Sequence, residues 1–269
     1  MFKGLKTLML ITVLATWVQA TVLCVAPNTA DCDMSICSSA HSTIQAAIDA
    51  ASDSGDEIRV AEGTYTTTTD TTIANPYGDD FIFRQVAIID TKSLSLRGGF
   101  STANWSVQNY KNHPSIIDAG GDGRSLTIYG TYIQNVIIDG FTLQNGDYSN
   151  LGNSRLGPTI GNWTCVRTGK DCGGGFWAKY VNLTLRNCII KSNIASTTNT
   201  YSDGGGAYLW STSSAVIDNV AFLNNTSDMY ASGGGLSFYY GSDAVITNSM
   251  FDGNMVGNGA AISFFQMSG

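Results

Sequence analysis

Four charged or polar residues stand at equivalent positions of a segment that recurs in the second half of the chain: Asp139, Arg186, Asp218 and Thr247. If the recurring segments stack, the guanidinium of Arg186 lies between two carboxylates, which suits either proton transfer or a row of ion pairs. Alternating charge favours the ion pairs, because it keeps adjacent segments from repelling one another. Asp139, Arg186 and Asp218 therefore remain catalytic candidates only for an alternative, enzymatic function.

Aromatic residues form a second group, in the short runs that follow the glycine clusters at 173–175, 204–206 and 233–235 and the further glycines at 257 and 259. Alternation along these runs predicts one set of side chains inside a strand layer and another on its outer face. The outer set comprises Lys179, Phe265 and the four rings that we predict to bind a ligand: Trp177, Tyr208, Trp210 and Tyr239. Exposed rings at regular spacing offer a platform for sugar rings or a partner's apolar surface. The other interpretation is that long turns fold over this face and bury it.

The repeat itself predicts the architecture. Segments beginning at Val136, Leu183, Ala215 and Ala244 align without gaps, and the last three begin 32 and 29 residues apart. Each unit holds two or three short β-forming runs with glycine turns between them. This period indicates a β-solenoid, whereas a propeller blade needs about 40 residues.

Two asparagine columns run through the alignment. The first occupies one position of every unit, where the residues are Gly140, Asn187, Asn219 and Asn248. Gly and Asn adopt left-handed backbone angles most easily, so this position predicts a bend between two strands. With coils about 4.8 Å apart, the amides of Asn187, Asn219 and Asn248 can bond to one another as a ladder. A second column, Asn193, Asn225 and Asn254, predicts another turn.

Composition narrows the class of protein. The 269 residues include 30 Gly and 4 Pro, 43% are hydrophobic, and the net charge is −7. This much apolar content fits a packed chain. An acidic chain lacks the basic surface of a nucleic-acid binder, so no nucleic-acid partner is expected. Glu and Lys are scarce while Thr, Ser, Val, Ile, Tyr and Phe abound, which predicts strands and excludes a helical bundle.

The first 20 residues are typical of a secretory signal peptide. Lys3 and Lys6 precede an apolar run over 8–18, and Ala20 ends a sequence that a signal peptidase can cleave. The run is about half as long as the roughly 20 residues of a membrane-spanning helix, and no later segment could span a bilayer. We therefore expect a secreted or cell-surface protein whose mature domain covers 21–269 and has no membrane span.

Secretion bears on the six cysteines, because disulfides persist in oxidising compartments. The candidates for pairing are Cys24, Cys32 and Cys37 in one cluster, and Cys165 and Cys172 in a loop insertion. We expect one bridge within the cluster and one from Cys165 to Cys172, although six cysteines allow fifteen connectivities. Cys188 is as suited to a packed thiol as to a bridge. No metal site is predicted, since zinc spacings are missing around the cysteines and both histidines.

The segment after the first cysteines contains one predicted helix. Ile44, Ala47, Ile48 and Ala51 share a face, Ser42 or Thr43 can serve as N-cap, and a strand over 57–61 follows. The order of helix, strand and Gly63-Thr64-Tyr65 resembles the opening of secreted right-handed β-helix proteins of the pectin-lyase-like superfamily. That resemblance implies a helix that covers the first coil, which would otherwise expose an apolar end and an unpaired strand edge.

A narrower resemblance covers roughly residues 173–265. Phe222-Leu223-Asn224-Asn225 and Phe251-Asp252-Gly253-Asn254 match the F-x-x-N element of the polymorphic outer membrane protein repeat. Gly205-Gly206-Ala207-Tyr208, Gly234-Gly235-Leu236 and Gly259-Ala260-Ala261-Ile262 are similar to its G-G-A-[ILV] element, from which Gly206-Ala207-Tyr208 and Gly235-Leu236 depart. In that family the β-helix is a surface-displayed adhesin or passenger, which implies the same role here.

Together these patterns predict an all-β, right-handed parallel β-helix with a short N-terminal capping helix, and we expect its last coil to be incomplete. The predicted function is that of a non-catalytic adhesin-like or glycan-binding protein with an extracellular glycan or cell-surface partner and no cofactor. The alternative is a polysaccharide lyase or glycoside hydrolase of the same fold. Pectate-lyase-like members abstract a proton beside a uronate carboxylate with Arg or Lys while carboxylates hold Ca²⁺, so calcium belongs to this alternative.

Overall fold

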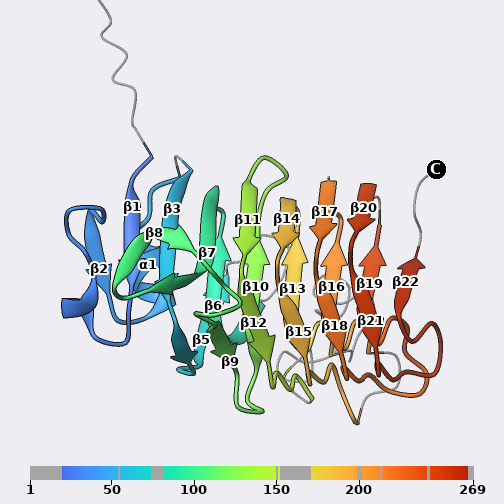
Figure 1. Cartoon of the computed structure of the whole chain (residues 1–269). Helices are drawn as coiled ribbons and strands as arrows, with labels where there is room; N and C mark the ends of the chain where they lie inside the picture. The colour runs from blue at the N-terminus through green and yellow to red at the C-terminus, as the bar shows by residue number, and fades with distance from the viewer. Residues whose placement is uncertain are drawn as a thin grey trace, which may run out of the picture.

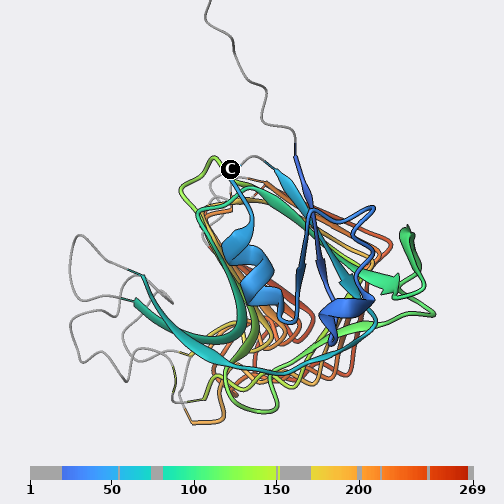
Figure 2. The same ribbon diagram turned by 90° about the vertical axis from the view of Figure 1, so that its left-hand side faces the viewer.

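The computed structural model describes residues 20–53, 55–73, 81–149, 151, 171–198, 202–212, 214–240 and 243–265. Residues 1–19 of the predicted signal peptide and Cys165 lie outside these ranges. The described strands follow one another along a single axis and form three sheets around a common interior (Figures 1 and 2). This arrangement confirms the predicted parallel β-helix. No helix in these ranges is long and apolar enough to cross a membrane.

From β3 onward, each coil contributes a strand to each of three sheets, which we name A, B and C. Sheet A contains β2 (Ser39–His41), β1 (Val22–Val25), β3 (Asp56–Ala61), β7 (Leu94–Ser101), β11 (Asn135–Asp139), β14 (Asn182–Arg186), β17 (Ser214–Asp218) and β20 (Asp243–Thr247), with β8 (Asn104–Gln108) beside β7. Sheet B contains β4 (Gly63–Tyr65), β9 (Ser115–Asp118), β12 (Phe141–Gln144), β15 (Ile189–Lys191), β18 (Ala221–Leu223) and β21 (Met250–Asp252). Sheet C contains β5 (Thr69–Ile73), β6 (Phe81–Asp90), β10 (Arg124–Tyr129), β13 (Phe176–Lys179), β16 (Ala207–Trp210), β19 (Leu236–Tyr239) and β22 (Ile262–Phe265).

The strand register reproduces the sequence alignment residue by residue. Leu183 pairs with Ala215, and Ala215 pairs with Ala244, in parallel strands of sheet A. Antiparallel pairing joins β5 to β6 and β7 to β8 at the N-terminal end. Because side chains alternate across a strand, this register keeps the column of Leu183, Ala215 and Ala244 facing inward on successive coils.

The interior is a continuous column of aliphatic and aromatic side chains from all three sheets. Phe222 stacks on Phe251 with ring centroids 4.7 Å apart, and Phe238 stacks on Phe264 at 4.8 Å. These separations match the spacing of neighbouring strands, so equal side chains on successive coils pack ring on ring. Burial of each large apolar side chain stabilises the fold by roughly 2 kcal/mol.

Helix α1 (Ile44–Ala50) lies across the N-terminal end of the β-helix (Figure 2). Thr43 is its N-cap and accepts a hydrogen bond from the backbone of Ala46, as expected from the sequence. The predicted face of Ile44, Ala47 and Ile48 is buried and packs on the end coil, so the cap keeps the apolar interior from water. A short 3-10 helix, η1 (Thr29–Asp31), lies between β1 and β2.

Candidate functional site

The charged column of sheet A is a row of ion pairs. The register places Arg97, Asp139, Arg186 and Asp218 on successive strands. Nε of Arg186 donates a hydrogen bond to Asp139 Oδ2 at 3.0 Å, and Nε of Arg97 lies 3.7 Å from the same oxygen. Asp218 accepts hydrogen bonds from Thr247 and Asn248, which lower its pKa. The structure thus brings the three catalytic candidates together, with both carboxylates already engaged.

The first asparagine column forms the left-handed bend predicted from the sequence, between sheets A and B. Asn187, Asn219 and Asn248 have φ angles of 54°, 55° and 51°. Nδ2 of Asn219 donates to Oδ1 of Asn187 at 2.8 Å, which confirms one link of the predicted ladder. Asn248 instead donates to Oδ1 of Asp218 at 2.8 Å, so the second link is made to a carboxylate rather than to an amide.

The second asparagine column is a buried ladder. Nδ2 of Asn193 donates to Oδ1 of Asn225 at 3.0 Å, and Nδ2 of Asn225 donates to Oδ1 of Asn254 at 2.9 Å. Asn193 and Asn225 are fully buried, and their amides also bond to backbone groups of Leu143 and Ile190. This column holds the corner beyond sheet B in place, because buried amides are stable only when they are hydrogen-bonded.

Glycine replaces asparagine at position 140 because a loop crosses the corner there. A Cβ on Gly140 would lie 2.7 Å from Nε2 of Gln108 and 3.2 Å from Cβ of Tyr110. The loop then runs along the asparagine column, where the Tyr110 hydroxyl accepts a hydrogen bond from Nδ2 of Asn219 at 3.1 Å. Between the loop and the outer face of sheet B lies a groove of about 470 Å³, with Ile189 and Met250 on its floor.

The predicted binding rings lie on the outer face of sheet C, but they are not exposed. Trp177 and Tyr208 have no exposed surface, and Trp210 and Tyr239 are 6% exposed. The prediction of an open aromatic platform is therefore wrong, and the interpretation of a covered face is correct. With Phe83, Ile88 and Cys172 these rings form a second apolar cluster outside the sheet. Burial follows from their size, because large rings that lose contact with water stabilise the fold.

Lys179 lies in the middle of this cluster and is 2% exposed. Its Nζ is 3.7 Å from the ring centroid of Trp210 and 4.4 Å from that of Tyr180. Burial lowers the pKa of Lys179 to about 7, while the ring faces attract the charged form. Lys179 on β13 pairs with Tyr129 on β10, and Tyr129 pairs with Asp90 on β6, so these three side chains belong to one column of sheet C.

Aromatic side chains reach solvent beside this cluster, near the C-terminal ends of the strands of sheet C. We call this group the aromatic rim; it consists of Tyr132, Tyr180, Tyr240 and Phe265. Tyr132 is 51% exposed, and Tyr240 and Phe265 are each 48% exposed. Tyr180 and Tyr240 follow their strands directly with φ angles of 58° and 55°. Sequence reasoning named Phe265 but missed the three tyrosines, although Tyr180 and Tyr240, each directly after a strand, were a usable signal.

The cysteines divide into bridged and free residues. Cys24 and Cys37 form a disulfide, which confirms the expected bridge within the first cluster. Cys172 is also disulfide-bonded, and its predicted partner Cys165 lies outside the described residues. Cys32 and Cys188 are free and buried. Burial raises the pKa of the Cys188 thiol to about 12, so this thiol is a packed, unreactive group.

Neither histidine lies in a metal-ligand cluster. His41 bonds to the Ser39 hydroxyl at 2.8 Å, and His113 pairs with Glu62 at 3.0 Å. Across the described ranges, no three His, Cys, Asp or Glu side chains converge as a metal-binding group.

Comparison with known proteins places this geometry in a family. Residues 115–268, more than half of the chain, match the family model described as "Right handed beta helix region". Among solved structures, the pectin methylesterase from Aspergillus niger in deglycosylated form is similar, with 12% sequence identity and a TM-score of 0.34 over 94% of this chain and 87% of that chain. No curated protein matches this chain. The parallel register, the three sheets and the family match agree, and this chain belongs to the right-handed β-helix family.

Proposed function

We propose that this protein is secreted and binds a glycan, without catalysing a reaction, at the aromatic rim of sheet C. The observation that carries the proposal is the half exposure of Tyr132 and Tyr240 beside a buried cluster. Rings exposed on one side and packed on the other offer a flat apolar face to the C–H face of a sugar.

The rim rings are held in place by their neighbours. Tyr132 and Tyr180 lie 4.4 Å apart between ring centroids, and Tyr239 lies 4.9 Å from Tyr240 and 5.2 Å from Phe265. Because these rings are already ordered, binding loses little side-chain entropy. From β10 to β22 the rim crosses four strand intervals, or about 19 Å, enough for several sugar units of an extended chain.

Secretion is supported by the leader pattern and by the disulfide chemistry. The Cys24–Cys37 bridge and the bonded state of Cys172 suit an oxidising compartment. An adhesin-like role at a cell surface fits a long β-helix whose outer face displays the rim.

The test is binding of the secreted mature protein to a glycan array, followed by titration of the strongest ligand against rim variants. Replacing Tyr132 and Tyr240 together by Ala is expected to weaken binding at least tenfold, because both rings are half exposed. The matched control is Tyr230→Ala, which removes a ring that is 57% exposed before β19, at the opposite end of the strand from Tyr240.

Two outcomes contradict the proposal. The first is a glycan whose binding is unchanged in the double variant and in the control alike. The second is release of an unsaturated uronate product from polygalacturonate with calcium, detected by its ultraviolet absorbance, which would establish the lyase alternative.

A further inference from the structure

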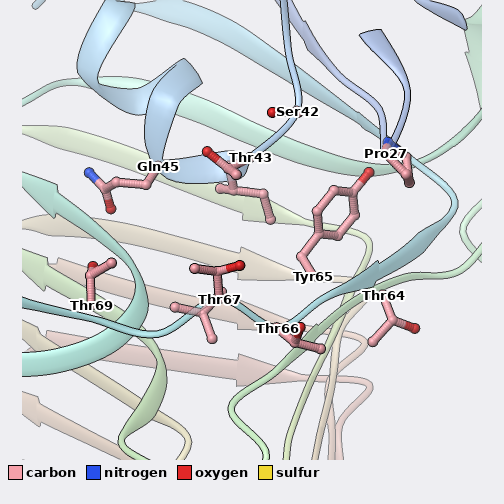
Figure 3. Close-up of a pocket in the computed structure, with 11 residues that line it drawn as sticks. Pro27, Ser42, Thr43, Gln45, Thr64, Tyr65, Thr66, Thr67 and Thr69 are labelled. Atoms are coloured by element: carbon pink, nitrogen blue, oxygen red, sulfur yellow. The ribbon is translucent and has the colours of Figure 1, made fainter.

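A second cavity lies away from the rim, at the N-terminal end of the β-helix (Figure 3). It opens between the start of α1 and the segment that leads from β4 into β5, and its volume is about 290 Å³. We call it the cap pocket. Its position beside the capping helix separates it from the outer face of β10 to β22, where the rim lies.

The floor of the cap pocket is apolar and rigid. Ile44, Tyr65 and Val86 line it and are 1%, 7% and 5% exposed. The Tyr65 hydroxyl donates to the backbone carbonyl of Ala61 at 3.1 Å, which fixes the ring. The ring is therefore a fixed part of the apolar floor, and only a small part of it faces the pocket.

One wall is fixed by α1. Gln45 accepts a hydrogen bond from the backbone N–H of Ile88 at 2.7 Å and donates to the backbone carbonyl of the same residue at 3.3 Å. Thr43 caps the helix. These bonds tie α1 to β6, so the width of the pocket does not depend on a mobile side chain.

The mouth carries hydroxyl groups with unused hydrogen-bonding capacity. Ser42, Thr64, Thr66 and Thr67 line the mouth and are exposed, and Figure 3 shows them around the Tyr65 ring. In the part of the chain that the structure describes, their hydroxyls make no hydrogen bond, unlike the hydroxyl of neighbouring Thr68, which donates to Asp122. Each hydroxyl can both donate and accept, so the mouth suits a ligand with several hydroxyl groups.

The pocket has no charge to offer. Its lining consists of Pro, Ser, Thr, Ile, Gln, Tyr and Val residues. A charged ligand would lose its hydration without gaining an ion pair, whereas a neutral one avoids that loss. The volume of about 290 Å³ is at the lower end of the range for ligand sites, which limits the ligand to about one ring.

We propose that the cap pocket binds one ring of a neutral sugar, with its hydroxyls at the threonines of the mouth and its less polar side toward the floor. This site lies outside the aromatic rim and goes beyond the function proposed above. It stands or fails independently of the rim.

The experiment titrates the mature protein with the methyl glycosides of glucose, galactose and mannose, and with methyl galacturonoside as the acidic counterpart. Saturation-transfer NMR detects binding, and calorimetry measures the dissociation constant. At least one neutral glycoside is expected to bind with a dissociation constant of the order of 1 mM, which suits one small ring. The double variant Thr66→Val and Thr67→Val keeps the shape of both side chains and is expected to weaken that binding at least tenfold.

Thr68→Val is the matched control, because Thr68 is a neighbouring threonine outside the pocket lining; binding is expected to stay within twofold. The Tyr132 and Tyr240 double variant is also expected to retain the cap-pocket binding, which separates this proposal from the rim. The proposal is overturned if no neutral glycoside binds below about 50 mM. It is equally overturned if the valine double variant, shown to melt at the wild-type temperature, binds as wild type does, or if the uronoside binds as tightly as the neutral sugars.

Discussion

The guanidinium of Arg186 is hydrogen-bonded to the carboxylate of Asp139 at 3.0 Å, across 47 residues of sequence and a single step between strands of sheet A. The side chain of Asp139 is 2% exposed while that of Arg186 is 43% exposed. Asp139 also accepts a hydrogen bond from Asn187 at 2.7 Å and faces Arg97. The Asp139 carboxylate therefore links three coils through its contacts with Arg97, Arg186 and Asn187, and its oxygens are already engaged.

The contacts of Asp139 predict that two variants lose different amounts of stability. Arg186→Met is expected to lower the free energy of unfolding by about 1 kcal/mol, because the guanidinium is half exposed. Asp139→Leu is expected to lower it by about 3 kcal/mol, because Arg97, Arg186 and Asn187 all lose a partner. Urea unfolding followed by circular dichroism measures both. Equal losses would contradict the role of Asp139 as the centre of the row.

The two asparagine columns are expected to differ in stability. Asn225→Leu leaves buried partners on both neighbouring coils unsatisfied and is expected to lower the free energy of unfolding by about 3 kcal/mol. Asn219→Leu loses two solvent-exposed hydrogen bonds, to Tyr110 and Asn187, and a residue suited to positive φ, for a loss of about 1 to 2 kcal/mol. Thermal melting of both variants gives the comparison. A larger loss at Asn219 than at Asn225 would show that the inner ladder is not the stronger one.

Asparagine, which occupies the equivalent position of the other coils, is predicted to be destabilising at position 140. Gly140→Asn restores the asparagine column, but its Cβ would lie 2.7 Å from Gln108 Nε2 and 2.8 Å from the carbonyl oxygen of Gly98. We expect a loss of about 2 kcal/mol or displacement of the loop at Gln108. Asn187→Gly, at the equivalent position of the next coil, is the control and is expected to lose about 1 kcal/mol. Increased protease cleavage between residues 101 and 114 in Gly140→Asn alone would report the displacement.

Lys179 predicts a pH dependence of stability. Its pKa is about 7 in the folded protein against a usual value of 10.5, so between these values the unfolded chain binds more protons than the folded one. The free energy of unfolding is therefore expected to rise with pH above 7, by about 2 kcal/mol up to pH 9. The contact with Trp210 favours the charged form of Lys179, so the rise in the free energy of unfolding is expected to be smaller than burial alone would give. Urea unfolding of wild type and Lys179→Met at pH 7, 8 and 9 isolates the contribution, since the variant lacks the rise. Parallel curves for the two proteins would exclude this origin.

The free thiols are expected to be inert in the native state. Cys188 is fully buried and its pKa is raised to about 12 by burial, so alkylation at pH 8 is expected only after unfolding. Peptide mapping without reduction is expected to recover Cys24 and Cys37 in one linked product. Rapid labelling of Cys188 in folded protein would refute its burial.

The repeat made the coils predictable, since one aligned column becomes one row of paired residues. Leu183, Ala215 and Ala244 follow from a period of about thirty residues, because parallel coils can stack only in a register that keeps apolar columns inside. The helix cap followed from Thr43 and the spacing of Ile44, Ala47 and Ile48. Local pattern and long-range packing agree in these elements.

The surface was less predictable, because alternation along a strand tells which side a residue faces and not what covers that side. Trp210 and Tyr239 face outward as expected and are nevertheless 6% exposed. Tyr110 and Asn219 are 109 residues apart, and no periodicity relates them, so their contact had no sequence signal. The cap pocket likewise joins α1 to threonines after β4, which only the path of the first coil brings together.

The bond from Tyr110 to Asn219 has a consequence for cooperativity. In a solenoid, each coil is stabilised chiefly by its contacts with the coil before it and the coil after it. Unfolding can therefore proceed one coil at a time from an end. The loop after β8 adds a contact between coils that are not neighbours, because its Tyr110 bonds to Asn219 directly after β17. We therefore expect the coils between them to open together. Amide hydrogens of β11, β14 and β17 are expected to exchange at more similar rates in wild type than in Tyr110→Phe, which lacks this bond.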